Sequence, residues 1–280
     1  MSIVWKNGSL MDESEANVSL FAHALHYASA FFEGIRMYKT DDGQSAIFRL
    51  REHYQRLYES CKIYKTEIPY DIDTLINATL ETIKANNLDE CYIRPIVYRG
   101  RNTLGVEGRN CPVEVAILVW YWGAYKGEGA LENGLNVQFS SWQRPAQNTF
   151  PTFDEGIALN TEGKISEGSG ENVFFVKNGV IYTTPISAST LIGITRNSVI
   201  TVAQDLGYTV IEQDLPREFA YVADEAFFSG TAVEISPINT IDRIKLGTGK
   251  PGPVTLAIQK AYFDVVRGNS SKHNDWLTYL

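Results

Sequence analysis

The chain has 280 residues, of which 44% are hydrophobic and 12% aromatic, and its net charge at pH 7 is −8. A chain of this length and composition indicates a globular protein, and two domains are expected. The negative charge argues against nucleic acid and anionic membranes as partners, because both require clustered lysine and arginine.

No membrane span or export signal is expected. The longest apolar run, residues 115–122, is too short to cross a bilayer and predicts a buried strand. The N-terminal residues show no basic start followed by an apolar block, as a signal peptide would. Cys61, Cys91 and Cys111 are far apart and form no C-x-x-C pair, which favours reduced core thiols in a cytoplasmic protein.

The first 122 residues alternate strand and helix signals and predict an N-terminal α/β domain. Asn7-Gly8 and Asp42-Gly43 interrupt apolar runs as β-hairpin turns do. Segments 51–64 and 71–87 carry apolar residues at helical spacing, and the second begins at an aspartate cap. The strand and hairpin segments expected in this domain are 3–11, 34–40, 45–50, 91–98 and 113–122.

Residues 123–134 are glycine-rich and weakly periodic, so they predict a linker to a second α/β domain, residues 135–280. Tight hairpins, such as the one expected at Asn178-Gly179, favour mixed rather than purely parallel sheets. The elements expected in this domain are strands near 135–142, 209–214 and 225–230, a hairpin at 171–184, and helices at 195–206, near Pro216 and at 253–266.

Two turns of the second half present backbone N–H groups that could bind an anion. Gly193, Ile194 and Thr195 stand at a predicted helix start, where the helix dipole is positive. Residues 229–232 form a turn of small residues between two strands. Each pattern also occurs as an ordinary cap or turn. Arg56, on a predicted helix, is either a solvated charge or a phosphate partner through its planar fork.

Glu167 lies between a strand and a Gly-Ser-Gly turn. A carboxylate held there could face a bound heterocycle and keep a ring nitrogen protonated. The alternative is a turn glutamate in water. The histidines have no cysteine or carboxylate partners at ligand spacing, so no metal site is expected.

Two clusters combine aromatic and basic residues. Tyr92 and Arg94 alternate on a predicted buried strand and so share one face, where they require an anionic or hydrogen-bonding partner. An internal ion pair with an acidic residue is the alternative. Tyr27, Phe32 and Arg36 form the second cluster.

Eight motifs occur in order along the chain: "HALHYASAFFEGIRMY", "REHYQRL", "YIRP", "WGAY", "SSWQR", "ISEGSGEN", "LIGITR" and "FFSGTAVEI". From about Trp5 to Phe263 they resemble the fold-type IV pyridoxal-phosphate aminotransferases, and most closely the branched-chain amino-acid aminotransferases. The resemblance implies a two-domain α/β fold with mixed sheets, an active site between the domains, and pyridoxal 5′-phosphate as cofactor.

The resemblance also implies roles for individual residues. Tyr92 and the Thr231-Ala232 backbone would take the substrate α-carboxylate, and Glu167 would pair with the pyridinium nitrogen. The residues implied for the cofactor are Arg56, Glu167, Leu191, Gly193, Ile194, Thr195 and Thr231. The residues implied for the substrate are Tyr27, Phe32, Arg36, Tyr92, Arg94, Trp122, Tyr125 and Ala232.

One part of the family pattern has no counterpart. In the family, the segment after the Pro-Thr that matches Pro151-Thr152 carries the Schiff-base lysine, whereas here Thr152 adjoins Phe153 and about twenty residues are absent. Lys164 is the nearest lysine, but we expect it in a hairpin turn across a strand.

Two explanations for the gap compete. Either the natural chain lacks these residues, or it contains them and they are missing from this sequence. A true deletion would remove a helix and a connection from the second domain. The burial lost with them, at ~25 cal/mol per Å² of apolar surface, would exceed a typical stability margin of ~5–15 kcal/mol. We therefore expect the natural polypeptide to contain residues, including the lysine, beyond those in this sequence.

The implied activity is amino transfer between branched-chain L-amino acids (leucine, isoleucine, valine) and 2-oxoglutarate, by a homodimer or larger homo-oligomer. A D-amino-acid aminotransferase or an aminodeoxychorismate lyase of the same fold would share the cofactor residues. If the lysine is truly absent, the chain could instead be a catalytically inactive relative that binds pyridoxal phosphate.

Overall fold

The computed structural model describes residues 2–123, 125–127, 129–143 and 156–280. The chain forms two compact units. Unit 1 consists of Met1–Trp122 and Val265–Leu280, and unit 2 consists of Gly123–Asp264. The domain limits expected from the sequence stay a prediction.

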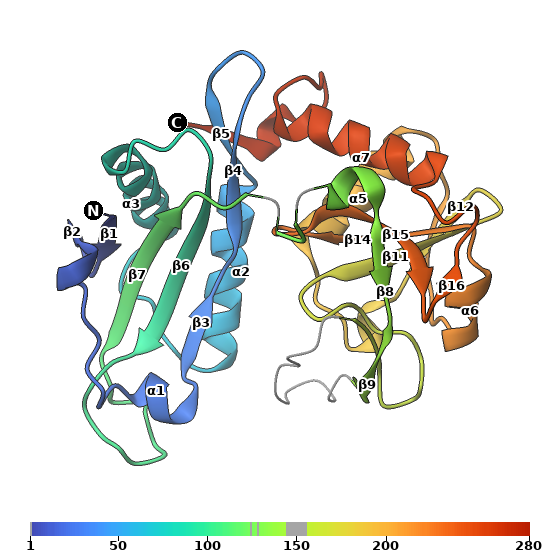
Figure 1. The fold of residues 1–280 in the computed structure, drawn as a ribbon. Helices are drawn as coiled ribbons and strands as arrows, with labels where there is room; N and C mark the ends of the chain where they lie inside the picture. The colour runs from blue at the N-terminus through green and yellow to red at the C-terminus, as the bar shows by residue number, and fades with distance from the viewer. Residues whose placement is uncertain (1, 124, 128, 144–155) are drawn as a thin grey trace. The chain divides into compact units, whose positions relative to one another are not determined.

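Unit 1 is built on an eight-stranded antiparallel sheet with the order β17-β5-β4-β6-β7-β1-β2, in which β3 also pairs with β6 (Figure 1). The hairpins expected at Asn7-Gly8 and Asp42-Gly43 are confirmed. The strands are β1 (Ile3–Lys6), β2 (Ser9–Asp12), β3 (Ala30–Phe32), β4 (Ile35–Lys39), β5 (Ser45–Phe48), β6 (Cys91–Arg99), β7 (Val113–Trp120) and β17 (Leu277–Tyr279). The helical segments are η1 (Glu13–Glu15), α1 (His23–Tyr27), α2 (Leu50–Ile63), α3 (Ile72–Ala85) and η3 (Asn274–Trp276).

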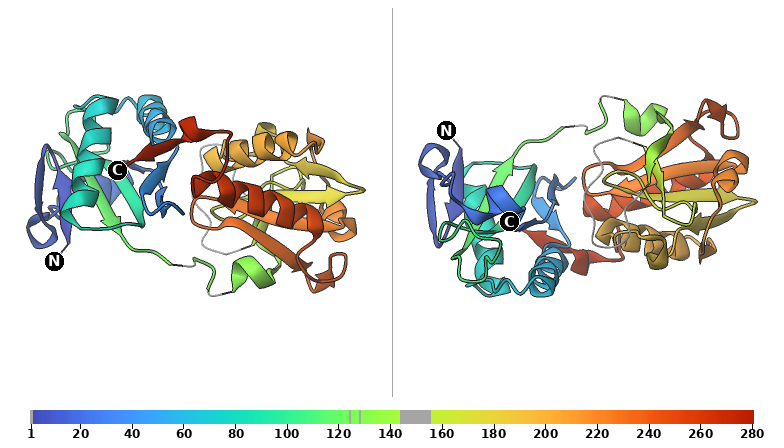
Figure 2. Two further views of the ribbon diagram at one scale, coloured as in Figure 1. Left: turned by 90° about the horizontal axis from the view of Figure 1, so that it is seen from above. Right: turned by 90° about the horizontal axis from the view of Figure 1, so that it is seen from below.

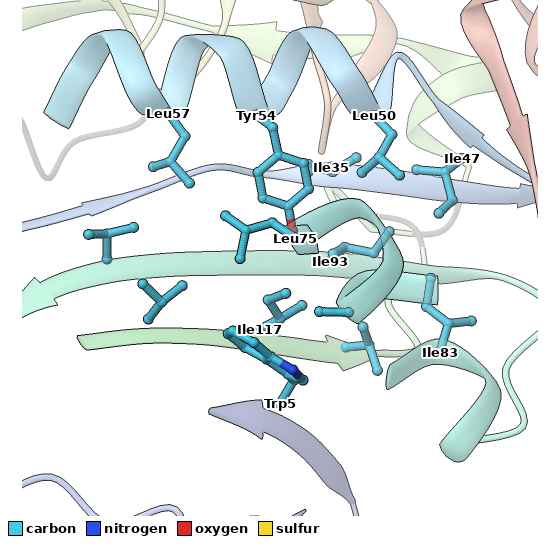
Figure 3. Packing of buried hydrophobic residues seen from close by; sticks show 14 of the residues in the cluster. Trp5, Ile35, Ile47, Leu50, Tyr54, Leu57, Leu75, Ile83, Ile93 and Ile117 are labelled. Atoms are coloured by element: carbon cyan, nitrogen blue, oxygen red, sulfur yellow. The ribbon is translucent and has the colours of Figure 1, made fainter. Parts of the chain in front are cut away.

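The core of unit 1 lies between the sheet and the helices α2 and α3 (Figure 3). Leu50, Tyr54 and Leu57 follow one another at helical spacing, so they point from one face of α2 toward the strands, where they pack in one cluster with Ile93. The Tyr54 hydroxyl forms a 2.6 Å hydrogen bond with Thr79 of α3, which satisfies both buried oxygens. Both expected helices are confirmed.

Local signals set both ends of α3. The Asp71 carboxylate accepts a 2.7 Å hydrogen bond from the Thr74 backbone N–H and so caps the helix start. Asn86 ends the helix, and its side chain bonds the Ile3 backbone N–H at 2.9 Å and carbonyl at 2.7 Å. The helix is thereby joined to β1 at its C-terminal end.

Unit 2 contains a seven-stranded mixed sheet with the order β13-β12-β11-β14-β15-β16, in which β8 also pairs with β15. β13 pairs in parallel with β12, and β8 pairs in parallel with β15. The other neighbouring strands of this sheet are antiparallel, so the expectation of mixed sheets is confirmed. A separate two-stranded parallel sheet joins β9 and β10. The strands are β8 (Leu135–Val137), β9 (Phe139–Gln143), β10 (Ile157–Leu159), β11 (Asn172–Lys177), β12 (Val180–Thr183), β13 (Val210–Glu212), β14 (Glu225–Gly230), β15 (Glu234–Ile241) and β16 (Ile244–Lys245).

The helices of unit 2 include the three expected from the sequence and one in the segment expected as a linker. They are α4 (Ala130–Asn133), η2 (Ile186–Ala188), α5 (Ile194–Asp205), α6 (Arg217–Val222) and α7 (Pro253–Val266). α4 lies in the segment expected as a linker, and the last two residues of α7 belong to unit 1. α7, the long red helix of Figure 2, contacts β15 through Gln259, which donates a 2.9 Å hydrogen bond to the Ile235 carbonyl. Buried Glu225 accepts from the Thr255 backbone N–H at 2.8 Å and caps this helix.

None of the helices in the described part of the chain combines the length and the apolar character of a membrane span. The three cysteines are buried and free, as expected.

Candidate active site

Arg56 lies on α2 and pairs with Glu33, which lies in the turn between β3 and β4. Its Nε donates to Oε1 and its Nη2 donates to Oε2, each over 2.7 Å. The Glu33 side chain is 5% exposed and that of Arg56 is 22% exposed. Arg56 is therefore not a solvated charge on the helix surface, but one half of a bidentate ion pair.

His53 also holds this carboxylate, with Nδ1 2.8 Å from Glu33 Oε2. Burial lowers the pKa of His53 below its ordinary value of 6.5, although Glu33 acts in the opposite direction. Burial acts to raise the pKa of Glu33, but hydrogen bonds from Arg56 and His53 outweigh it and hold this pKa below 4.5. Glu33 is therefore ionised at pH 7 and accepts from the Nδ1–H of a neutral His53.

Sequence reasoning assigned no role to Glu33 or His53. A signal was present for His53, because residues 53 and 56 are three apart on a helix and therefore share one face. No local pattern connects Glu33 with them, since it lies 23 residues before Arg56.

Tyr92 and Arg94 project from the same face of β6, as their spacing predicts. Arg94 Nη2 donates to the Tyr92 hydroxyl over 3.1 Å, and the guanidinium lies 4.3 Å from the ring centre of Phe32. Among the described residues, Arg94 is held by aromatic rings rather than by an acidic partner, so the internal ion pair is not found. Its Nε is buried and has no hydrogen-bond partner there, which makes it suited to a ligand carboxylate.

Gly34, which follows Glu33, leaves the space that the Tyr92 hydroxyl occupies. A Cβ atom at position 34 would collide with that hydroxyl. The turn at residues 33–34 therefore contacts both Arg56 and Tyr92, which are expected to bind different parts of the ligand.

Two further residues of the predicted substrate pocket join this cluster in unit 1. Arg36 Nη2 donates to the Trp122 carbonyl over 3.4 Å, and the Trp122 ring stands edge-on to Tyr92 with centres 4.5 Å apart. Tyr27 lies on α1, where its hydroxyl donates to the Leu104 carbonyl over 2.7 Å. The place of Tyr27 in the pocket stays a prediction.

Glu167 of unit 2 is 1% exposed, so it is not a turn glutamate in water. Its Oε2 accepts from Asn172 Nδ2 over 2.7 Å and from the Leu191 backbone N–H over 3.0 Å. A buried carboxylate requires such donors, and they fix its orientation. The group is therefore built to present a negative charge in a defined direction.

The first turn of α5 lies next to Glu167. Gly193 is the N-cap, and a Cβ atom there would collide with the Asn172 amide that holds Glu167. Ile194 and Thr195 follow in the first turn, at the positive end of a 12-residue helix. The expected helix start is confirmed, and the Asn172 side chain lies against it.

The turn expected between two strands joins β14 to β15 and contains Thr231 and Ala232. Ser229, at the end of β14, pairs in register with Asn172 of β11. Its hydroxyl is buried without a hydrogen-bond partner among the described residues. Glu167, the α5 start and the end of β14, which leads into this turn, are thus grouped around Asn172.

A buried ion pair that sequence reasoning missed lies in the same unit. Lys126 Nζ is 3.3 Å from Glu171 Oε1, with side-chain exposures of 9% and 2%. The ammonium also lies 4.9 Å from the ring centre of Tyr125, the residue expected in the substrate pocket. No sequence signal relates Lys126 to Glu171, because their approach depends on the fold.

The junction Thr152–Phe153, where the expected lysine has no counterpart, lies outside the described residues. Lys164 lies in a tight turn with Asn160, as expected. The Asn160 N–H donates to the Lys164 carbonyl over 2.7 Å, and the Lys164 N–H donates to Asn160 Oδ1 over 2.9 Å.

The sequence matches the profile of the amino-transferase class IV family at residues 30–153 and 151–241. The match is thus divided at residues 151–153.

Curated relatives match nearly the whole chain. A branched-chain-amino-acid aminotransferase of Pseudomonas aeruginosa is 41% identical over 99% of this chain and 97% of its own length. The Escherichia coli enzyme of the same name is 43% identical over 98% of this chain and 96% of its own length. The alignment with the first spans 300 positions, so at least 20 of them have no residue in this 280-residue chain.

Solved structures agree with these relatives. A crystal structure of the Escherichia coli branched-chain amino acid aminotransferase has a TM-score of 0.94 and 42% identity, covering 99% of this chain and 98% of that one. A branched-chain amino acid aminotransferase from Thermobaculum terrenum, solved in its PLP-form, has a TM-score of 0.90 and 31% identity, covering 99% of this chain and 98% of that one.

Proposed function

This chain belongs to the amino-transferase class IV family, and we propose that it transfers an amino group between leucine, isoleucine or valine and 2-oxoglutarate, with pyridoxal 5′-phosphate as cofactor. The observation that carries this proposal is the 43% identity to the Escherichia coli branched-chain-amino-acid aminotransferase over 98% of this chain. The mixed α/β fold agrees with this proposal, since a solved relative matches it with a TM-score of 0.94 over 99% of this chain.

The residues of each unit fit a phosphorylated pyridine. In unit 2, buried Glu167 is held in place to accept a hydrogen bond from a protonated ring nitrogen. The first turn of α5 offers backbone N–H groups at the positive end of the helix, and the buried Ser229 hydroxyl, which has no partner among the described residues, can donate a hydrogen bond. In unit 1, Arg56 supplies the cation for the phosphate.

We assign the cofactor to the following residues. Arg56, the backbone N–H groups of Ile194 and Thr195, and Thr231 hold the phosphate, while Leu191 packs on the ring. When bound, the cofactor supplies an electron sink for reactions at the substrate α-carbon. Glu167 keeps the ring nitrogen protonated, which this chemistry requires.

The substrate is bound by polar groups and aromatic walls. Tyr92 and the Thr231-Ala232 backbone take the α-carboxylate. The side-chain pocket has to accept an apolar chain in one half-reaction and the second carboxylate of glutamate in the other, and Arg94 is the group able to bind that carboxylate. The walls of this pocket are Tyr27, Phe32, Arg36, Trp122 and Tyr125.

We also propose that the natural enzyme contains about twenty residues between Thr152 and Phe153, including the lysine by which this family holds its cofactor. The divided family match and the alignment positions without a residue in this chain support it. A second function follows if the natural chain lacks these residues as this sequence does: it would bind the cofactor without transferring an amino group. We further propose that the protein is a homo-oligomer located in the cytoplasm, where free cysteines such as these stay reduced.

The decisive experiment uses protein purified from its native host. With pyridoxal 5′-phosphate present, L-leucine, L-isoleucine and L-valine should each convert 2-oxoglutarate to glutamate. D-alanine and aminodeoxychorismate serve as controls for the two related activities. Turnover of either control in preference to L-leucine would refute the substrate assignment, and cofactor binding with no turnover would establish the second function.

A further inference from the structure

Three residues form what we term the Glu33 clamp: Glu33, His53 and Arg56. Glu33 lies at the centre, with Arg56 on two carboxylate oxygens at 2.7 Å and His53 on one at 2.8 Å. All of these groups belong to unit 1.

The clamp fixes the direction of the guanidinium. This group is planar, and Glu33 engages its Nε and Nη2 edge, so Nη1 takes no part in the fork. Two parallel bonds prevent rotation of the plane about the side-chain axis. The position of Glu33 therefore constrains the direction in which Arg56 Nη1 points.

Glu33 itself has little freedom to move. Its backbone N–H donates to the Pro95 carbonyl over 3.1 Å, and its side chain is 5% exposed. Gly34 is fixed against the Tyr92 hydroxyl. The His53 ring, 2% exposed on α2, cannot shift without disturbing the core.

We propose that Glu33, held by His53, is a positioning residue that aims the Arg56 guanidinium at the cofactor phosphate. The inference rests on the phosphate role given to Arg56 under the proposed function. It goes beyond that role because Glu33 and His53 act on the phosphate through Arg56.

A purely electrostatic effect has the opposite sign. The Glu33 carboxylate offsets part of the Arg56 charge and repels a phosphate dianion. If charge alone mattered, Glu33→Gln would strengthen phosphate binding. If positioning dominates, the same change weakens binding, because the neutral amide offers one acceptor oxygen instead of two and loses the charge-assisted fork.

The test uses pyridoxamine 5′-phosphate and pyridoxamine as titrants of the cofactor-free protein. Neither has an aldehyde, so binding is independent of any lysine. Arg56→Ala should weaken the phosphorylated probe about tenfold to a hundredfold, and Glu33→Gln about fivefold to thirtyfold. Pyridoxamine should change by less than about twofold in both variants, because it carries no phosphate.

Two further variants separate positioning from loss of structure. His53→Asn retains an N–H donor for Glu33 and should bind the phosphorylated probe like the unaltered protein, whereas His53→Leu should resemble Glu33→Gln. In an Arg56→Ala background, Glu33→Gln should have no further effect on either probe, since there is no guanidinium left to aim. Near-ultraviolet circular dichroism checks that each variant is folded.

Several results would overturn the inference. They are tighter or unchanged binding of pyridoxamine 5′-phosphate by Glu33→Gln, an equal loss for both probes, and an undiminished loss in the Arg56→Ala background. The amino-transfer assay of the unaltered protein is separate. If the protein fails that assay but its variants lose affinity for pyridoxamine 5′-phosphate alone, the clamp inference stands and the proposed activity is refuted. If the protein passes the assay but the variants show no such selective loss, the activity stands and the clamp inference is refuted.

Discussion

Arg94 shows at the scale of one residue how a cation can remain largely buried without an acidic partner in the described part of the chain. The ring of Phe32 lies 4.3 Å from its guanidinium and that of Tyr92 lies 5.3 Å away, so the charge faces aromatic π-systems. Such contacts stabilise a cation by ~0.5–2 kcal/mol each, less than a carboxylate in the same place would. The buried Nε without a partner leaves a donor for a ligand.

The first prediction concerns this donor. Arg94→Met keeps most of the apolar stem but removes a charged partner worth about 1.5–3 kcal/mol, so kcat/KM for glutamate or 2-oxoglutarate should fall roughly tenfold to a hundredfold. The leucine half-reaction should fall much less, because its side chain makes no ion pair. Stopped-flow absorbance of the cofactor measures both half-reactions. An equal loss for leucine and glutamate would assign Arg94 to the common α-carboxylate or to the fold.

At the scale of secondary-structure elements, α2 and the β3–β4 turn act together. The side of α2 that bears Leu50, Tyr54 and Leu57 builds the core, while His53 and Arg56 reach Glu33 in the turn. Packing of the apolar residues of α2 against the sheet therefore also places His53 and Arg56 within hydrogen-bond distance of Glu33.

This arrangement predicts a pH dependence of stability. Because the pKa of His53 is lowered on folding, the unfolded chain binds more protons once the pH falls below the ordinary value of 6.5. The stabilising effect of a neutral His53 is complete above that pH and is lost as the pH falls toward the folded pKa. The lowered pKa of Glu33 adds a loss of the same sign below 4.5.

Urea denaturation at pH 8, 6.5 and 5.5 measures this effect as the free energy of unfolding. The free energy should fall with pH in the unaltered protein. His53→Asn, which cannot titrate in this range, should show a smaller fall. The same fall in both proteins would show that His53 is not the group responsible.

At the scale of the whole molecule, each of the two units carries residues that the proposed function uses. Unit 1 carries Arg56 and the Tyr92–Arg94 face, and unit 2 carries Glu167 with the α5 start. The C-terminal residues return to unit 1, where β17 pairs with β5. The residues that we propose to bind the cofactor are thus present in the chain, although the lysine has no counterpart in the sequence.

The last prediction addresses that lysine. The protein from its native host should be heavier than 31.3 kDa, by the mass of about twenty further residues. Borohydride reduction with pyridoxal 5′-phosphate should leave the cofactor on a lysine between Thr152 and Phe153. Peptide mapping locates it. A mass of 31.3 kDa, or a label on Lys164, would show that the family lysine is missing from the natural chain.

The sequence alone determined the elements whose signals are local. These signals are the Asn-Gly and Asp-Gly turns, the Asp71 cap and the spacing of apolar residues on α2. Each involves only a few neighbouring residues, so it can be recognised in the sequence without the tertiary structure. The same holds for the shared face of Tyr92 and Arg94 and for the α5 start, because strand and helix periods are fixed by backbone geometry.

Tertiary structure decided the rest, because burial and pairing depend on what other segments bring. From the sequence, Glu167 could be either a solvated turn residue or a buried carboxylate. Only the tertiary structure shows that Asn172 and the Leu191 N–H donate hydrogen bonds to it. Glu33 meets Arg56 across 23 residues, since helix and turn are brought together by the packed core rather than by any local pattern. A charge far apart in sequence from its partner acquires its role through packing, and packing is a property of the whole fold.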